Sequence, residues 1–180
     1  MDGVISPEWP AVAVDKFIAN SQVLSSLYGD APALGGDLRL RSVNLNWIGP
    51  TVTLRVDLAR FPEAAPQEWL DAELDTVQCQ LEFLGVDHMA MAGWNPPVLA
   101  RVNVVGRRER RRIQVEVRSE KEGFTLSFEC SDSVVVGRVG AFRVQDDGMD
   151  GGSTLHVKRL DSRLYGTLPD TCEKVYYERF

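Results

Sequence analysis

The chain has two histidines, His88 and His156, and they limit the acid–base and metal chemistry open to it. His88 follows Asp87, whose carboxylate could orient an imidazole, but no nucleophile motif such as GxSxG accompanies this pair. Two histidines cannot form a histidine-rich metal cluster. His156 alternates with apolar neighbours, so we expect it on the solvent-exposed face of a strand. We therefore predict no catalytic residue, no metal site and no cofactor. An enzyme of unknown chemistry using Asp87 and His88 is the alternative.

Three aspartates near two glycines, Asp146, Asp147 and Asp150, suggest the oxygen ligands of a calcium loop. Their spacing is not that of such a loop, and the closing glutamate is missing. An acidic, glycine-rich sequence is also typical of a connection between elements. We interpret residues 146–152 as a linker.

Five arginines between residues 107 and 112 form the most basic segment of the chain. Clustered guanidinium groups bind phosphate well, so a nucleic-acid-binding module is a second alternative. No aromatic residues for base stacking are interleaved with them, and the whole chain carries a net charge of −6. We favour a solvated hairpin tip for Arg107–Arg112 and regard nucleic acid as an unlikely partner.

The acidic loop between residues 63 and 75 is the best candidate for a binding site. Residues 1–100 hold 5 basic against 13 acidic side chains, a net −8, whereas residues 101–180 hold 15 against 13, a net +2. An acidic surface attracts basic partners and speeds their encounter, and a tryptophan can anchor the contact. We predict a partner-binding surface that extends from this loop to Trp94, with the following residues: Glu63, Glu68, Trp69, Asp71, Glu73, Asp75 and Trp94.

A pair of strands between Leu38 and Leu58, joined at Ile48-Gly49-Pro50, organises the predicted fold. The second strand alternates strictly from Thr51 to Leu58, which puts one face on a core. In the first strand the apolar phase slips by one residue near Arg41-Ser42. Because such a slip exchanges the two faces of a strand, we expect a β-bulge there.

The other elements are one helical region and several more strands. Helical spacing from Pro10 to Tyr28 predicts one bent helix or two short ones, with Asn20 as an N-cap and Gly29 as the C-terminal stop. A helical turn is expected to start at Pro66. Period-2 alternation predicts strands at 77–83, 88–93, 98–104, 113–117, 124–130, 134–144, 154–158 and 174–177.

These elements predict the α+β class, with an N-terminal helix or helix pair packed on a mostly antiparallel β-sheet or sandwich. We expect a domain over residues 1–145, the linker over 146–152, and a tail over 153–180 with one or two strands packed on the same domain. Three cysteines without CxxC spacing (Cys79, Cys130 and Cys172) indicate free thiols in a reducing compartment. The absence of a leader and of a long apolar run favours the cytoplasm and no membrane contact.

Several sequence motifs occur in an order that is similar to a known family. Trp9, Asn20 and Leu24 precede LYGDAP (27–32), GPTVTLRVDL (49–58), FPEAAPQEW (61–69), DTVQCQLEFLGV (75–86) and the pair Gly93-Trp94. From about Trp9 to Val144 the chain resembles the immunity protein 50 family of bacterial polymorphic toxin systems. None of these motifs is catalytic, and most look structural.

The resemblance implies a small cytoplasmic antidote that binds and blocks a toxin domain encoded beside it. A toxin domain that acts on nucleic acid needs a basic substrate cleft, which an acidic loop would match. We therefore expect the partner to be a cognate toxin domain, with a basic nuclease-type toxin as one candidate. Self-association is left open.

Overall fold

The computed structural model describes residues 11–107, 111–150 and 154–157. Its central element is the predicted hairpin, formed by β2 (Asp37–Asn46) and β3 (Thr51–Asp57). The two strands pair from Leu40 with Val56 directly to Ser42 with Arg55, so Arg41 is the extra residue. The β-bulge predicted at Arg41-Ser42 is confirmed.

The ten strands of the described residues form one sheet, in which every strand pair is antiparallel. The order is β10-β9-β4-β3-β2-β6-β7-β8-β5, and β1 pairs with β6 beside β2. The remaining strands are β1 (Val12–Ala13), β4 (Thr76–Leu84), β5 (Asp87–Ala92), β6 (Val98–Arg107), β7 (Arg112–Ser119), β8 (Phe124–Ser131), β9 (Val134–Phe142) and β10 (Leu155–His156).

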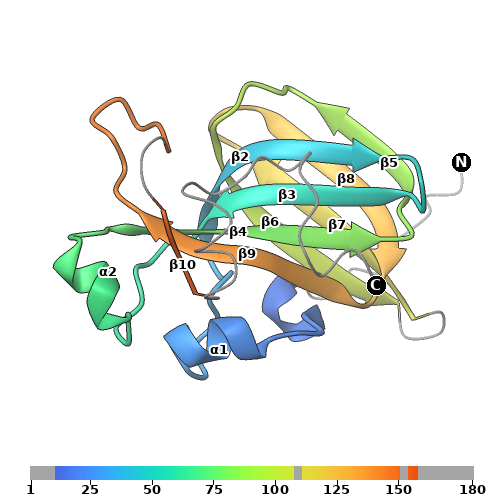
Figure 1. The fold of residues 1–180 in the computed structure, drawn as a ribbon. Coiled ribbons are helices and arrows are strands. Elements are labelled where there is room, and N and C mark those ends of the chain that lie inside the picture. Colours follow the sequence, from blue (N-terminus) through green and yellow to red (C-terminus); the bar gives the residue numbers. More distant parts are fainter. Residues whose placement is uncertain (1–10, 108–110, 151–153, 158–180) are drawn as a thin grey trace, which may run out of the picture.

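The sheet curls over itself, so that β2, β3 and β4 lie in front of β6, β7 and β8 (Figure 1). The rings of Phe83 on β4 and Phe128 on β8 meet edge-on, with 5.1 Å between their centroids. Both side chains are buried, and they belong to one core built from the inward residues of both layers. Alternation along each strand supplies this core, because every second side chain points inward.

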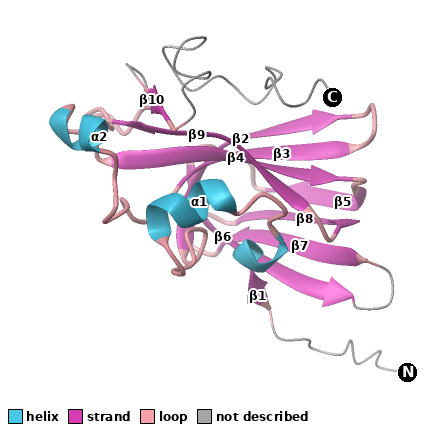
Figure 2. Cartoon of the chain, turned by 60° about the horizontal axis from the view of Figure 1, so that its bottom comes forward, coloured by secondary structure: helices cyan, strands magenta, loops and turns pink. Residues whose placement is uncertain are grey.

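The helices are few and short. The N-terminal region holds a 3₁₀ turn at Val14–Phe17 and then α1 (Gln22–Tyr28), which lies across the opening between the β4–β9 and β6 sides of the sheet (Figure 2). This matches the prediction of two short helices, and Gly29 ends α1 with a φ of 62° as expected. The predicted N-cap is wrong, since Ser21 occupies that position. Asn20 instead bonds the backbone of Val136 on β9 through both amide atoms, at 2.7 and 2.8 Å.

The predicted mostly antiparallel sheet is thus confirmed. The helices are shorter and hold fewer residues than a protein of the α+β class usually has. A helical turn does follow Pro66, as α2 (Gln67–Asp71). None of the helices in the described residues is long and apolar enough to cross a membrane.

The chain after β9 returns to the sheet through β10, which pairs Leu155 with Ala141 and His156 with Gly140. The strand predicted at 154–158 is therefore present, and the one at 174–177 lies outside the described residues. His156 is buried, so its predicted place on a solvent-exposed face is wrong. It fits there because Gly140 has no side chain: a Cβ would lie 3.2 Å from the Nδ1 atom of His156.

Two of the three cysteines lie in the core as free thiols, Cys79 on β4 and Cys130 on β8. Burial raises the pKa of the Cys79 thiol well above its usual range. Burial likewise raises the pKa of Cys130 to about 12, although the nearby charge of Arg112 opposes this. Both thiols stay protonated near neutral pH and are chemically inert. Cys172 lies outside the described residues.

Gly93 lies where the backbone between β5 and β6 touches the β7–β8 turn. Its φ is +70°, and a Cβ would lie 2.2 Å from the carbonyl oxygen of Gly123. Gly123 itself has a φ of +68° with nothing within 4 Å of a Cβ, which makes it a matched control.

We predict that Gly123→Ala lowers the free energy of unfolding by about 1–2 kcal/mol, the strain of a left-handed alanine. Gly93→Ala should lose about 1–3 kcal/mol more, because its methyl group must displace backbone. Urea unfolding of both variants measures the difference. Equal losses would contradict the contact between Gly93 and Gly123.

Candidate protein-binding surface

Trp69 joins the acidic loop to the hydrophobic core. It lies on α2, is 1% exposed, and its ring faces Phe61 at 6.2 Å between centroids. Its backbone oxygen accepts a hydrogen bond from the amide of Leu74 at 3.0 Å, which turns the chain toward β4. Trp69 was predicted as an anchor for a partner, but it belongs to the core and offers a partner no surface.

The five predicted carboxylates around Trp69 are all exposed. Glu73, at a φ of 53°, pairs with Arg143 through Oε2 at 2.7 Å, and its carbonyl oxygen accepts a second bond from the same guanidinium. Asp75 accepts a bond from the amide of Val144 at 3.0 Å. These contacts join the loop before β4 to the segment after β9.

The segment after β9 adds two more exposed carboxylates, those of Asp146 and Asp147. It forms a tight turn, in which the amide of Gly148 donates to the oxygen of Gln145 at 2.8 Å and the amide of Gln145 donates to Met149 at 3.2 Å. Residues 145–149 thus form a turn that is held by its own backbone hydrogen bonds. The division into domain, linker and tail remains a prediction.

A network of buried polar groups holds this segment in place. Arg41, the bulge residue, pairs with Asp57 on β3 at 2.6 Å, and the two side chains are 3% and 5% exposed. The same guanidinium donates to the carbonyl oxygen of Gly148 at 2.6 Å. The side-chain amide of Gln78 donates hydrogen bonds to the carboxylates of Asp57, at 2.6 Å, and Asp150, at 3.0 Å.

Asp150 is the second link between this segment and the sheet, because its carboxylate pairs with Arg55 on β3. Burial alone would raise the pKa of the Asp150 carboxyl. The hydrogen bond from Gln78 and the charges of Arg55 and Arg41 outweigh that effect and hold this pKa below its usual value. The Asp150 carboxylate is therefore occupied by Arg55 and Gln78, and it does not form a calcium loop with Asp146 and Asp147.

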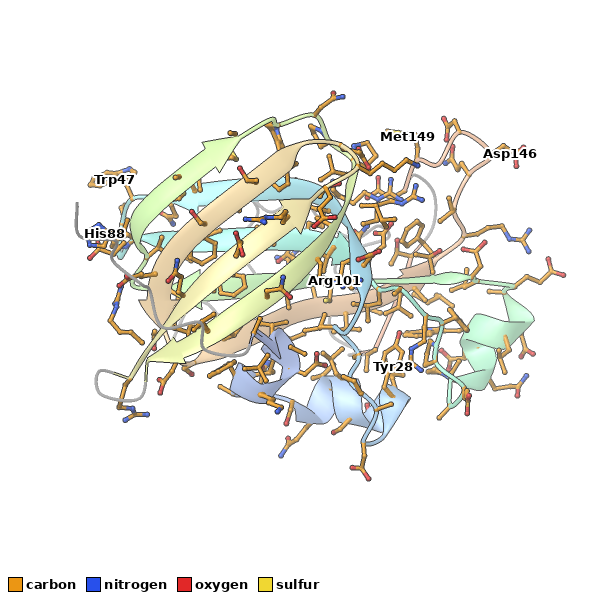
Figure 3. The ribbon with its side chains drawn as sticks, turned by 180° about the vertical axis from the view of Figure 1, so that it is seen from behind. Tyr28, Trp47, His88, Arg101, Asp146 and Met149 are labelled. Atoms are coloured by element: carbon orange, nitrogen blue, oxygen red, sulfur yellow. The ribbon has the colours of Figure 1, made fainter. Side chains whose placement is uncertain are left out.

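We call the resulting surface the acidic end. In Figure 3, Asp146 and Met149 lie on the same side of the molecule as α2. Arg143 pairs with one of the seven carboxylates, and the other six make no ion pair among those found in the described residues. Two large apolar side chains lie beside them, with exposed fractions of 49% for Leu70 and 51% for Met149. The seven carboxylates are those of Glu63, Glu68, Asp71, Glu73, Asp75, Asp146 and Asp147.

Trp94 lies elsewhere, between β5 and β6. Its ring packs on Phe124 at 5.3 Å between centroids and is 38% exposed. No contact found in the described residues joins Trp94 to the acidic end, so the structure does not bring these two predicted parts of the site together.

His88, the residue of the alternative enzyme function, lies on the opposite side of the molecule from Asp146 (Figure 3). The His88 Nε2 and Asp87 Oδ2 atoms are 3.9 Å apart, and both side chains are more than half exposed. Within residues 11–107, 111–150 and 154–157, no three His, Cys, Asp or Glu side chains are placed to hold a metal ion. Residues 108–110 of the arginine cluster lie outside the described residues, and Arg111 is exposed and pairs with Asp132 at 3.7 Å.

Comparison with known proteins decides the family. The model of the family described as Immunity protein 50 matches residues 20–139, two thirds of the 180-residue chain. The chain belongs to the immunity protein 50 family. The resemblance seen in the sequence motifs is thereby confirmed. No curated protein and no solved structure matches the chain.

The matched region of this chain ends within β9, at residue 139. It includes α2 and the whole predicted loop, but Asp146, Asp147 and Met149 follow it. The acidic end is therefore built from a segment inside the family match and a segment beyond it.

We predict that Trp69→Ala destabilises the fold by about 3–5 kcal/mol, the usual cost of removing a buried aromatic side chain. Trp94→Ala should cost clearly less, because part of that ring is already in water. Denaturant unfolding, followed by circular dichroism, compares the two variants. A Trp69→Ala variant as stable as the parent would contradict the burial of Trp69 in the hydrophobic core.

Proposed function

We propose that this chain is an immunity protein that binds a cognate toxin domain and neutralises it stoichiometrically in the cytoplasm. The observation that carries the proposal is the family match over residues 20–139. In this proposal the protein works by covering a surface of the toxin and performs no chemistry of its own.

We further propose that the toxin docks on the acidic end. Several exposed carboxylates on one side of the molecule favour a partner with a basic surface and raise the rate of encounter. A toxin that acts on nucleic acid has such a surface, because its substrate cleft must attract phosphate. Occupying that cleft would both bind and inhibit the enzyme.

Tight inhibition also needs buried apolar contacts, and Trp69 is not available for them. Leu70 on α2 and Met149 in the turn after β9 are half exposed and are flanked by the carboxylates. We propose these two side chains as the anchors, in place of Trp69. Hydrogen bonds already hold the α2 loop and the turn after β9 in place, so binding would cost little conformational entropy in these two segments.

We also propose that the toxin interface extends as far as Trp94, the outermost residue of the surface predicted from the sequence. The alternative enzyme and nucleic-acid functions gain no support from the exposed pair of Asp87 and His88 or from the ion-paired Arg111.

We predict that the variant Glu68→Lys/Asp71→Lys binds the toxin domain at least about tenfold more slowly at low salt, because the attraction between opposite charges is lost. The probe is the catalytically inactivated toxin domain encoded beside this chain, and surface plasmon resonance gives the association rate. The matched control is Asp87→Lys/Asp132→Lys, which changes the net charge equally at the start of β5 and just after β8, at the far end of β5 from Trp94.

The control should bind like the parent. If both variants slow association equally, only the total charge matters and the acidic end is not the docking site. If the parent fails to bind the toxin domain at all, the proposed function itself is wrong.

A further inference from the structure

A groove of about 320 Å³ lies at the end of the β2–β3 hairpin, where the chain passes from β4 into β5. It is lined by the end of β2, the start of β3, the turn between them and the start of β5. The residues around it are Leu45, Asn46, Trp47, Pro50, Thr51, Val52, Val86, Asp87, His88 and Met89.

The hairpin tip beside this groove carries the most exposed large apolar side chains of the described residues. Trp47 is 85% exposed and Ile48 is 70% exposed. The tip is nevertheless held in shape, because the amide of Ile48 donates to the Asn46 side chain at 3.0 Å and the Thr51 hydroxyl donates to the oxygen of Gly49 at 2.6 Å. An exposed tryptophan on an ordered turn is a typical anchor of a protein interface.

The other side of the groove is an open strand edge. Among the described residues, β5 ends the sheet and pairs only with β8, and all six of its residues are exposed. Met89 and Met91 are 40% and 41% exposed. A bulge between Asp87 and Ala90, with His88 at a φ of 49°, distorts the start of this edge and disfavours simple strand addition there. Contact through side chains is the better fit.

The charge of this surface points to its occupant. The groove is lined by one carboxylate, that of Asp87, and one imidazole, with no lysine or arginine. A basic partner gains little from such a surface, and the acidic end suits it better. Two copies of a chain with a net charge of −6 repel each other, and they can approach most easily where each presents few charges.

We propose that this surface joins two copies of the chain in a symmetric dimer, with Trp47 and Ile48 of each copy packed into the groove of the other. A two-fold interface uses the same surface on both subunits and must therefore be self-complementary. Here an apolar projection and an apolar groove lie side by side, which meets that requirement. Figure 3 shows Trp47 and His88 on the side opposite Asp146 and Met149, so the dimer leaves both acidic ends accessible.

The test is sedimentation velocity of the purified full chain from low to high micromolar concentration. The variants are Trp47→Glu and, as a second change on the other side of the groove, Met89→Glu. The matched control is Leu70→Glu, which places the same charge on a half-exposed leucine of α2. Because Trp47 makes little contact with its own fold, circular dichroism should show that its variant folds like the parent.

We expect a dimer for the parent and for the control. Each groove variant should raise the dimer dissociation constant at least about thirtyfold, as loss of a binding anchor typically does. A parent that stays monomeric at every concentration overturns the proposal, as does a dimer that both groove variants leave intact. It is also overturned if Trp47→Glu abolishes binding of the inactivated toxin domain without changing the dimer, since the groove then belongs to the toxin.

Discussion

The ion pair between Arg41 and Asp57 is the interaction on which the rest of this structure depends. Burying two charges costs several kcal/mol for each ion, and only good geometry with further hydrogen bonds offsets that cost. Here Arg41 reaches Asp57 with both Nε and Nη2, at 2.8 and 2.6 Å, and Gln78 satisfies the second oxygen of the carboxylate. Losing either charged partner would leave the other buried and uncompensated.

This pair explains why the bulge lies where it does. If Arg41 were paired in regular register, the residues that follow it would exchange faces relative to Leu38 and Leu40, which point into the core. As the extra residue of a bulge, Arg41 can direct its guanidinium along the sheet toward Asp57 and still reach the carbonyl oxygen of Gly148. The segment from 145 to 150 is thereby fixed next to the loop that carries α2. A constraint in the middle of the sheet thus builds the acidic end from two parts of the chain that lie about seventy residues apart.

Much of the fold could be predicted from the sequence, because period-2 alternation directly records which face of a strand is buried. The strands, the hairpin and the bulge follow from this alternation, and Pro66 itself marks the start of the helical turn. Contacts between distant segments leave no local pattern, so the role of Asn20, the burial of His156 and the docking of Asp150 could not be found this way. The burial of Trp69 has the same cause, since only the packed structure shows that α2 lies against Phe61. An acidic loop with a tryptophan looks the same in sequence whether the ring points outward or inward.

The exposed tip at Trp47 and Ile48 was missed for the opposite reason. Trp47 continues the apolar phase of Val43 and Leu45, and such a phase predicts burial. An apolar residue in this phase is buried only where a second layer covers the strand. The strand β2 extends past its partner β6, which pairs with it only through residues 37–40. Unequal strand lengths between layers cannot be read from a pattern along one strand.

The central claim is that two segments, held together by the buried network, form one docking surface for the toxin domain. Hydrogen–deuterium exchange of the chain, alone and with the inactivated toxin domain, tests this claim most directly. The claim predicts that binding slows amide exchange in residues 63–75 and in residues 143–150 together. Protection confined to residues 45–52 and 86–92, with the acidic end unchanged, would contradict it.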